Sequence, residues 1–189
     1  MYRSETQTAL SKNILYFLRW TAISIVMGIV CGLIGTIFGY GVIYAQRLFK
    51  TYSFMLYLMP VAGVLIVLLH QMFHEIGNRG TNLILESISS NEKIHMTTLP
   101  CIFVSTILSQ AVGASAGKEG AALQIGGCIG NYLGDLFHMD ERDKKVMIMS
   151  GMSGCFGAIF GTPLAADMFG IEVISIGVAY YAALVPCVF

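Results

Sequence analysis

The sequence predicts an all-α, polytopic membrane protein whose transmembrane helices are partly short and broken. Hydrophobic residues fill 56% of the 189 positions and charged residues only 12%, and the mean hydropathy is +0.72. A soluble domain of this length could hardly cover so much apolar surface with polar side chains. Several long apolar runs are separated by glycine-rich and proline-rich breaks, which points to helices that cross or enter a bilayer.

The chain divides into a polar N-terminal segment, residues 1–19, and a transmembrane domain, residues 20–189. The start of the chain lacks the early apolar core of a cleavable signal, so we expect the first hydrophobic segment to remain in the mature protein. That segment, Trp20 to Tyr44, exceeds the roughly 20 residues that a spanning helix needs. Its glycines, spaced three or four apart, predict one face buried against protein; they are Gly28, Gly32, Gly35 and Gly39.

Further helices are predicted from the remaining apolar stretches, which are Phe54–Leu69, Leu99–Val112, Ala121–Phe137, Val146–Phe160 and Pro163–Phe189, the last with room for two helices. Gly126, Gly130 and Gly134 repeat every four residues and predict a helix-packing face. The charged patch from Asp135 to Lys145 is expected to connect two helices in water. Three breaks separate the helices: Gly77–Asn82, Gly113–Gly120 and Gly157–Pro163.

Broken helices at membrane depth are tolerated where their backbone is buried in protein or lines a cavity. The N-terminus of a half-helix offers free N–H groups and the positive end of the helix dipole, which together favour an anion. The breaks therefore indicate an anion pathway.

Glu119 is the strongest candidate for a functional residue. It stands with Lys118 between Gly117 and Gly120, at the head of an apolar helix. An ionisable side chain within a membrane segment is a functional-site hypothesis by default. The alternative is an ordinary helix-start carboxylate paired with Lys118.

These residues resemble a known family, the CLC chloride channels and proton-coupled anion exchangers. Gly117–Gly120 resembles the family motif G-R-E-G-P, with Lys118 for Arg and Ala121 for Pro, and Leu123–Gly126 resembles its continuation V-Q-I-G. Gly151–Glu172 is similar to the following glycine-rich helix and the N-A-P-L-A-G turn. Gly77–Glu86 takes the place of G-S-G-I-P-E but matches it weakly.

The resemblance implies roles for particular residues. Glu119 would be the gating glutamate, whose carboxylate competes with anions and carries protons. A charged carboxylate is destabilised in a dry site, so this side chain can alternate between an anionic plug and a neutral, displaced acid. The anion would meet Gly117, Lys118 and Gly120 at one helix start and Thr81 or Asn82 at another. For Thr81 and Asn82 the alternative is a simple N-cap.

Two departures favour the branch that contains fluoride/proton antiporters. The motif proline is replaced by Ala121, and Ser-Gly-Ile-Pro is absent. Val173 stands where many exchangers carry an internal proton glutamate. Glu172 before it either faces water or marks the membrane boundary, and no role is assigned to Asp167.

The predicted function is transport of a small inorganic anion, fluoride in preference to chloride, in exchange for protons. A passive, voltage-gated type of chloride channel and a non-transporting membrane fragment or scaffold remain as alternatives. The family builds its pathway from two inverted repeats, so we expect this chain to be the first repeat, truncated at its C-terminus. The resemblance also implies a cytoplasmic N-terminus, a multi-pass location in the cell membrane, and a homodimer in the lipid bilayer when full length.

Other classes are disfavoured. The net charge is zero and no long basic run occurs, so nucleic acid is not an expected partner. We expect no cofactor, no metal and no enzymatic activity.

The five cysteines lie apart in apolar segments, which suits packing, and they are Cys31, Cys101, Cys128, Cys155 and Cys187. His70 and His74 lack a third ligand. Gly113–Glu119 lacks the spacing of a phosphate loop, and Gly151–Gly154, although like an intramembrane serine protease motif, has no later histidine to act as base.

Overall fold

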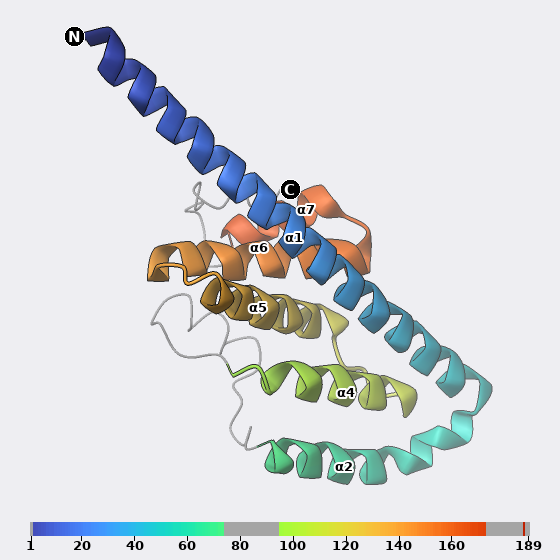
Figure 1. The fold of residues 1–189 in the computed structure, drawn as a ribbon. Coiled ribbons are helices and arrows are strands. Elements are labelled where there is room, and N and C mark those ends of the chain that lie inside the picture. The colour runs from blue at the N-terminus through green and yellow to red at the C-terminus, as the bar shows by residue number, and fades with distance from the viewer. Residues whose placement is uncertain (1, 74–94, 173–186, 188–189) are drawn as a thin grey trace.

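The fold is all-α throughout the part of the chain that the structure describes. The structure is a computed structural model, and it describes residues 2–73, 95–172 and 187. Its helices are α1 (Tyr2–Thr51), the 3-10 helix η1 (Ser53–Leu58), α2 (Met59–Met72), α4 (Thr98–Ala111), α5 (Lys118–Leu136), α6 (Glu141–Phe160) and α7 (Pro163–Glu172). Each predicted apolar stretch within the described ranges thus contains a helix. Figure 1 shows α1 as a long diagonal rod with α6, α5, α4 and α2 stacked along it.

Helix α1 is longer than the predicted span of Trp20–Tyr44, because it runs without interruption from Tyr2 to Thr51. Its core-facing residues recur every three or four positions, as expected for one face of a helix; they include Trp20, Ser24, Met27, Cys31, Phe38 and Val42. The remaining faces carry large exposed apolar side chains such as Ile29 and Leu33.

The predicted glycine face of α1 is only partly correct. Gly35 packs against α6, since a Cβ added to it would lie 3.1 Å from the Cβ of Ala158. Gly32 and Gly39 would meet nothing within 4 Å, and Gly28 and Gly32 line a cavity. The face that α1 presents to the core follows its larger apolar residues, so most of these glycines lie beside the contact and not in it.

Helices α5 and α6 form the closest contact in the fold, and this confirms the predicted packing face of α5. A Cβ added to Gly126 would collide with the carbonyl group of Gly151, and one added to Gly130 would lie 2.7 Å from the Cα of Ile148. Gly134 meets the side chain of Lys144. Glycine therefore lets the two backbones touch directly, which any side chain would prevent.

Helix α6 occupies the centre of the molecule, with α5, α1 and α7 packed around it, and α4 lies between α5 and α2 and also touches α1. The middle of α6 is accordingly buried from Val146 to Ser153. All five cysteines are buried and free, in agreement with a packing role.

The connection between α5 and α6 is shorter than the predicted one. Only residues 137–140 separate the two helices, and Glu141 to Lys145 already belong to α6. Glu141 and Asp143 in this first turn suit the positive end of the helix dipole, which explains why a charged stretch is helical. Lys144 Nζ lies 2.7 Å from Asp135 Oδ1 and links the end of α5 to the start of α6.

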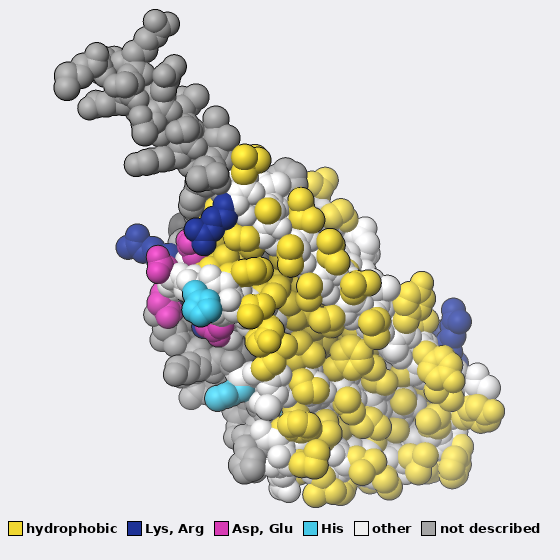
Figure 2. Space-filling model, in the orientation of Figure 1, with side chains coloured by type: hydrophobic (Ala, Val, Ile, Leu, Met, Phe, Trp, Pro, Cys, Tyr) yellow, Lys and Arg dark blue, Asp and Glu magenta, His cyan; other side chains and the backbone are white. Residues whose placement is uncertain are grey.

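The outer surface is mostly apolar. Figure 2 shows a broad hydrophobic face with acidic, basic and histidine side chains gathered toward its margins. Among the described residues, Phe17–Thr51 and Ser53–Met72 are long and apolar enough to cross a membrane, and Thr98–Ala111 is a shorter apolar helix. A broad apolar surface of this kind is suited to contact with lipid.

Candidate functional site at the start of α5

The candidate site begins with the loop that delivers Gly117 to the head of α5. Helix α4 ends at Ala111, and Gly113 turns the chain with a φ of +82°, a left-handed conformation that glycine adopts without penalty. A side chain there would also strike the ring of Phe49 on α1. The backbone N–H groups of Gly113 and Ala114 donate to the carbonyl oxygens of Gln110 and Ser109, at 3.2 and 2.9 Å. This turn ends α4 and directs residues 114–117 toward the next helix.

The side chain of Gln110 holds the loop in place. Its Nε2 donates to the carbonyl oxygen of Ala116, directly before Gly117. Its Oε1 accepts a hydrogen bond of 3.1 Å from Gln46 Nε2 on α1. Gln110 is itself buried, so a chain of two hydrogen bonds fixes the entry to α5 against α1.

Helix α5 starts without a side-chain cap. Gly117 is its N-cap. The backbone of Gly117 is extended, and no side chain makes a capping hydrogen bond there. The first backbone N–H groups of a helix lack partners within it and carry the positive end of the dipole. Such a terminus favours a negatively charged group.

Glu119 lies in the first turn of α5 with its carboxylate folded back toward this terminus. A Cβ placed on Gly117 would be 3.0 Å from Glu119 Oε2. The side chain is exposed, and no ion pair joins it to Lys118 within the described ranges 2–73 and 95–172. The structure therefore does not support the alternative in which Glu119 is simply paired with Lys118.

Lys118 instead reaches across to α6. Its Nζ lies 4.9 Å from the centroid of the Phe160 ring. Phe160 packs against Phe156 at 4.5 Å between ring centroids, and Phe156 stacks on Phe169 of α7 at 5.6 Å. A row of aromatic rings thus connects the head of α5 to α7.

A cavity of about 360 Å³ lies beside the head of α5. Helices α2, α4 and α5 line this cavity, and each contributes polar side chains. These are His70 of α2, Ser105 and Thr106 of α4, and Gln124 of α5; Gly117 and Gly120 also line the cavity. The hydroxyl of Ser105 is shielded from solvent and has no hydrogen-bond partner among the described residues. Hydroxyl and N–H donors around an otherwise apolar hollow can bind a small anion.

Ser105 and Thr106 were missed by the sequence interpretation. The available signal was a pair of adjacent hydroxyl residues inside the apolar run Leu99–Val112. Helical periodicity alone could not reveal that this pair points at the start of the next helix.

Of the predicted site residues, the structure brings together Gly117, Lys118, Glu119 and Gly120 in the first turn of α5. Thr81 and Asn82 lie outside the described residues, as do His74, Val173 and the rest of the last apolar stretch except Cys187. Glu172 is exposed at the end of α7. No group of three metal-ligating side chains occurs among the described residues.

Comparison with known proteins finds a matching family and several similar proteins. A family model described as the voltage gated chloride channel family matches residues 62–189. A chloride/fluoride channel protein of Pseudomonas syringae pv. tomato is 34% identical over 174 residues, which are 92% of this chain and 38% of that protein. The H(+)/Cl(-) exchange transporter ClcA of Citrobacter koseri is 30% identical over 162 residues, 78% of this chain and 34% of that protein.

Two solved structures share the arrangement of helices. The crystal structure of a CLC-type fluoride/proton antiporter matches with a TM-score of 0.84 at 31% identity, over 90% of this chain and 44% of that one. A slow cyanobacterial Cl-/H+ antiporter matches with a TM-score of 0.67 at 23% identity, over the same 90% and 44%. The chain thus spans about two fifths of the length of the relatives it matches.

Proposed function

Because the chain belongs to the voltage-gated chloride channel (CLC) family, we propose that it moves a small inorganic anion across a membrane in exchange for protons, with Glu119 as gate and proton carrier. The observation that carries the proposal is the position of this carboxylate, folded over the uncapped start of α5 and free of Lys118. A negative group at that terminus occupies the place that favours a transported anion. Protonation would neutralise the Glu119 carboxylate and let this side chain move away from the helix start.

The anion would bind at the head of α5, where Gly117 and Gly120 expose backbone and Lys118 supplies positive charge. The unpartnered hydroxyl of Ser105 in the adjoining cavity adds a donor that a small anion can use. Thr81 and Asn82 are proposed as further anion ligands on the strength of the family resemblance.

Fluoride is the favoured anion. The matching relative of 34% identity is named a chloride/fluoride channel protein, and the solved structure with the higher TM-score is a fluoride/proton antiporter. The absence of Ser-Gly-Ile-Pro and of the motif proline at Ala121 supports the same choice.

A passive channel is the second candidate, because that same relative is called a channel. In it, Glu119 would gate the anion without carrying protons. The broad apolar surface and the two long apolar helices support a multi-pass location in the cell membrane. By family resemblance, the full-length protein would be a homodimer with the lipid bilayer around it.

The test uses protein expressed from its complete reading frame and reconstituted in liposomes. Efflux of fluoride and of chloride is measured together with proton uptake, for wild type and for Glu119→Gln. Exchange predicts proton movement driven by the anion gradient and abolished by Glu119→Gln, because an amide does not titrate. Anion flux without proton movement in wild type would identify a channel. Absence of anion flux from folded wild type would refute transport.

A further inference from the structure

Another cavity lies between α1, α6 and α7, with Cys187 also on its wall. Its volume is about 290 Å³, and Gly28 and Gly32 of α1 form part of its wall. Because these two positions lack side chains, α1 leaves room here that it fills elsewhere. A water molecule takes about 30 Å³ in the liquid, so the cavity has space for several.

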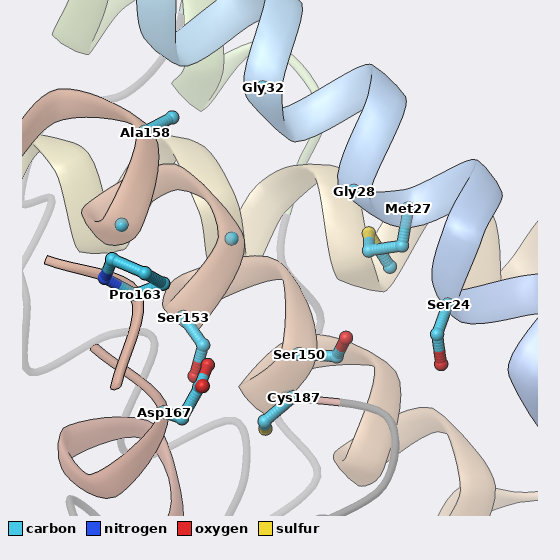
Figure 3. Close-up of a pocket in the computed structure, with 12 residues that line it drawn as sticks. Ser24, Met27, Gly28, Gly32, Ser150, Ser153, Ala158, Pro163, Asp167 and Cys187 are labelled. Carbon is cyan, nitrogen blue, oxygen red and sulfur yellow. The ribbon is translucent and has the colours of Figure 1, made fainter. Parts of the chain in front are cut away.

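The polar groups of this cavity are deeply buried. Ser24, Ser150, Ser153 and Asp167 line it and are each at most 8% exposed. Figure 3 shows Ser153 of α6 and Asp167 of α7 projecting into the same space, with Cys187 beside them. A hollow with several polar groups on its walls holds water, whereas a purely apolar one stays dry.

The hydroxyl of Ser153 is buried without a strong partner. It is 1% exposed and makes no well-formed hydrogen bond among the described residues, where only the thiol of Cys187, a weak hydrogen-bonding group, lies within reach. The Ser153 hydroxyl lies directly against Gly170, one helical turn from Asp167 on α7, and a side chain at Gly170 would collide with it. A buried hydroxyl without a strong partner is unfavourable unless water or another group supplies one, so this cavity is suited to hold water.

Among the described residues that line this cavity, none supplies a cation to balance the charge of Asp167. From α1, α6 and α7, the titratable groups that line the cavity among the described residues are Asp167 and the thiol of Cys187, and no lysine, arginine or histidine does so. A buried carboxylate is costly unless it is paired or neutralised by a proton. An ionisable side chain buried in a membrane protein is a candidate site for the exchange of ions or protons.

We propose that this cavity is a hydrated proton-binding site with Asp167 as its proton acceptor. The carboxylate takes a proton from a hydronium ion in the cavity, giving a neutral carboxylic acid and one water molecule, and the reverse step releases it. Water in the cavity hydrogen-bonds both forms of the acid and also the Ser153 hydroxyl. A divalent cation is not favoured, because one carboxylate offers too few charged oxygen ligands, and an anion would be repelled.

Infrared difference spectroscopy on the purified full-length protein tests the site without any transport assay. Spectra recorded between two pH values should contain a carboxylic acid C=O band that shifts in D2O. The band should disappear in Asp167→Asn and persist in Glu119→Gln and Cys187→Ser. Ser153→Ala should change the frequency of the band, because the water beside the acid loses a hydrogen-bonding partner.

Labelling wild type with carboxyl-13C aspartate provides a readout that needs no substitution, should Asp167→Asn fold poorly. The same band should then move to lower frequency. A band unaffected by the label, or identical spectra for wild type and folded Asp167→Asn, would overturn the proposal. Suppression of the band by Na+ or K+ at constant pH would also overturn it and identify a cation site.

The contribution to transport rests on the function proposed above and is measured separately. In liposomes, Asp167→Asn should lower proton uptake at least tenfold while anion flux continues. If wild type carries no anion, the transport proposal fails and the infrared result still decides the proton site. Unchanged proton uptake in Asp167→Asn would separate this site from exchange.

Discussion

The ammonium group of Lys118 lies over the ring of Phe160, 4.9 Å from its centroid. This contact joins the first residue of α5 to the last residue of α6. It keeps a positive charge beside the uncapped helix start and turns it away from Glu119. A cation over an aromatic ring is stabilised by about 0.5–1 kcal/mol where water has access.

Lys118→Met should weaken anion entry. A unit charge a few ångströms from the path contributes about 1 kcal/mol in water, so we expect about a fivefold loss of anion flux at low ionic strength. Salt screens such an effect, so the loss should shrink as ionic strength rises. Flux from liposomes at two salt concentrations measures both effects. Lys118→Arg is the matched control, and a loss in Lys118→Met that is independent of salt would contradict this electrostatic role.

Gln110→Met should loosen the loop before α5. The substitution removes the donor to Ala116 and the acceptor for Gln46, two part-buried hydrogen bonds that each contribute about 0.5–1.5 kcal/mol. Amide hydrogen exchange of residues 113–118, followed by mass spectrometry, should become faster. Gln46→Leu breaks only the outer bond, so its effect should be smaller. Equal protection of these amides in Gln110→Met and wild type would show that the loop does not depend on this side chain.

Gly130→Ala should destabilise the fold, because the added methyl group meets the backbone of α6 at Met147 and Ile148. Overpacking of a tight contact costs about 1–3 kcal/mol, and the thermal midpoint in detergent should fall. Gly39→Ala is the control, since it also replaces a helical glycine but meets nothing within 4 Å. Alanine in a helix is favoured over glycine by about 0.5–1 kcal/mol, so that variant should be at least as stable as wild type. Equal midpoints for the two variants would rule out a close α5–α6 contact.

Much of the helical architecture could be predicted because apolar runs and glycine breaks are local signals. The helix around Phe54–Leu69 and the packing stripe of Gly126 and Gly130 were predicted correctly, as was the start of a helix at the Lys118–Glu119 motif. The extent of α1 was underestimated, because hydropathy reports lipid contact and a helix can continue beyond it. The charged patch was assigned to a connection because its hydropathy is low, although Glu141 and Asp143 suit a helix start.

The site was predictable only where its residues are adjacent in the chain. Glu119 and its neighbours form one motif, so the sequence identified them together. Gln110, Ser105 and Phe160 reach the same helix start from other segments, and their proximity depends on packing between helices. No role was assigned to Asp167 from the sequence, because the cavity beside it depends on Gly28 and Gly32, which lie on a distant part of the chain.

The direct backbone contact of α5 with α6 limits how the proposed gate at Glu119 could move. Sliding or tilting of α5 would drive Gly126 and Gly130 into the opposing backbone. Rotation about the side-chain torsions of Glu119 meets no such obstacle, and exposed side chains change rotamer within picoseconds to nanoseconds. The proposed gate would therefore be a single pivoting side chain on a rigid frame, and its opening frequency would be governed by how often the carboxyl group gains a proton.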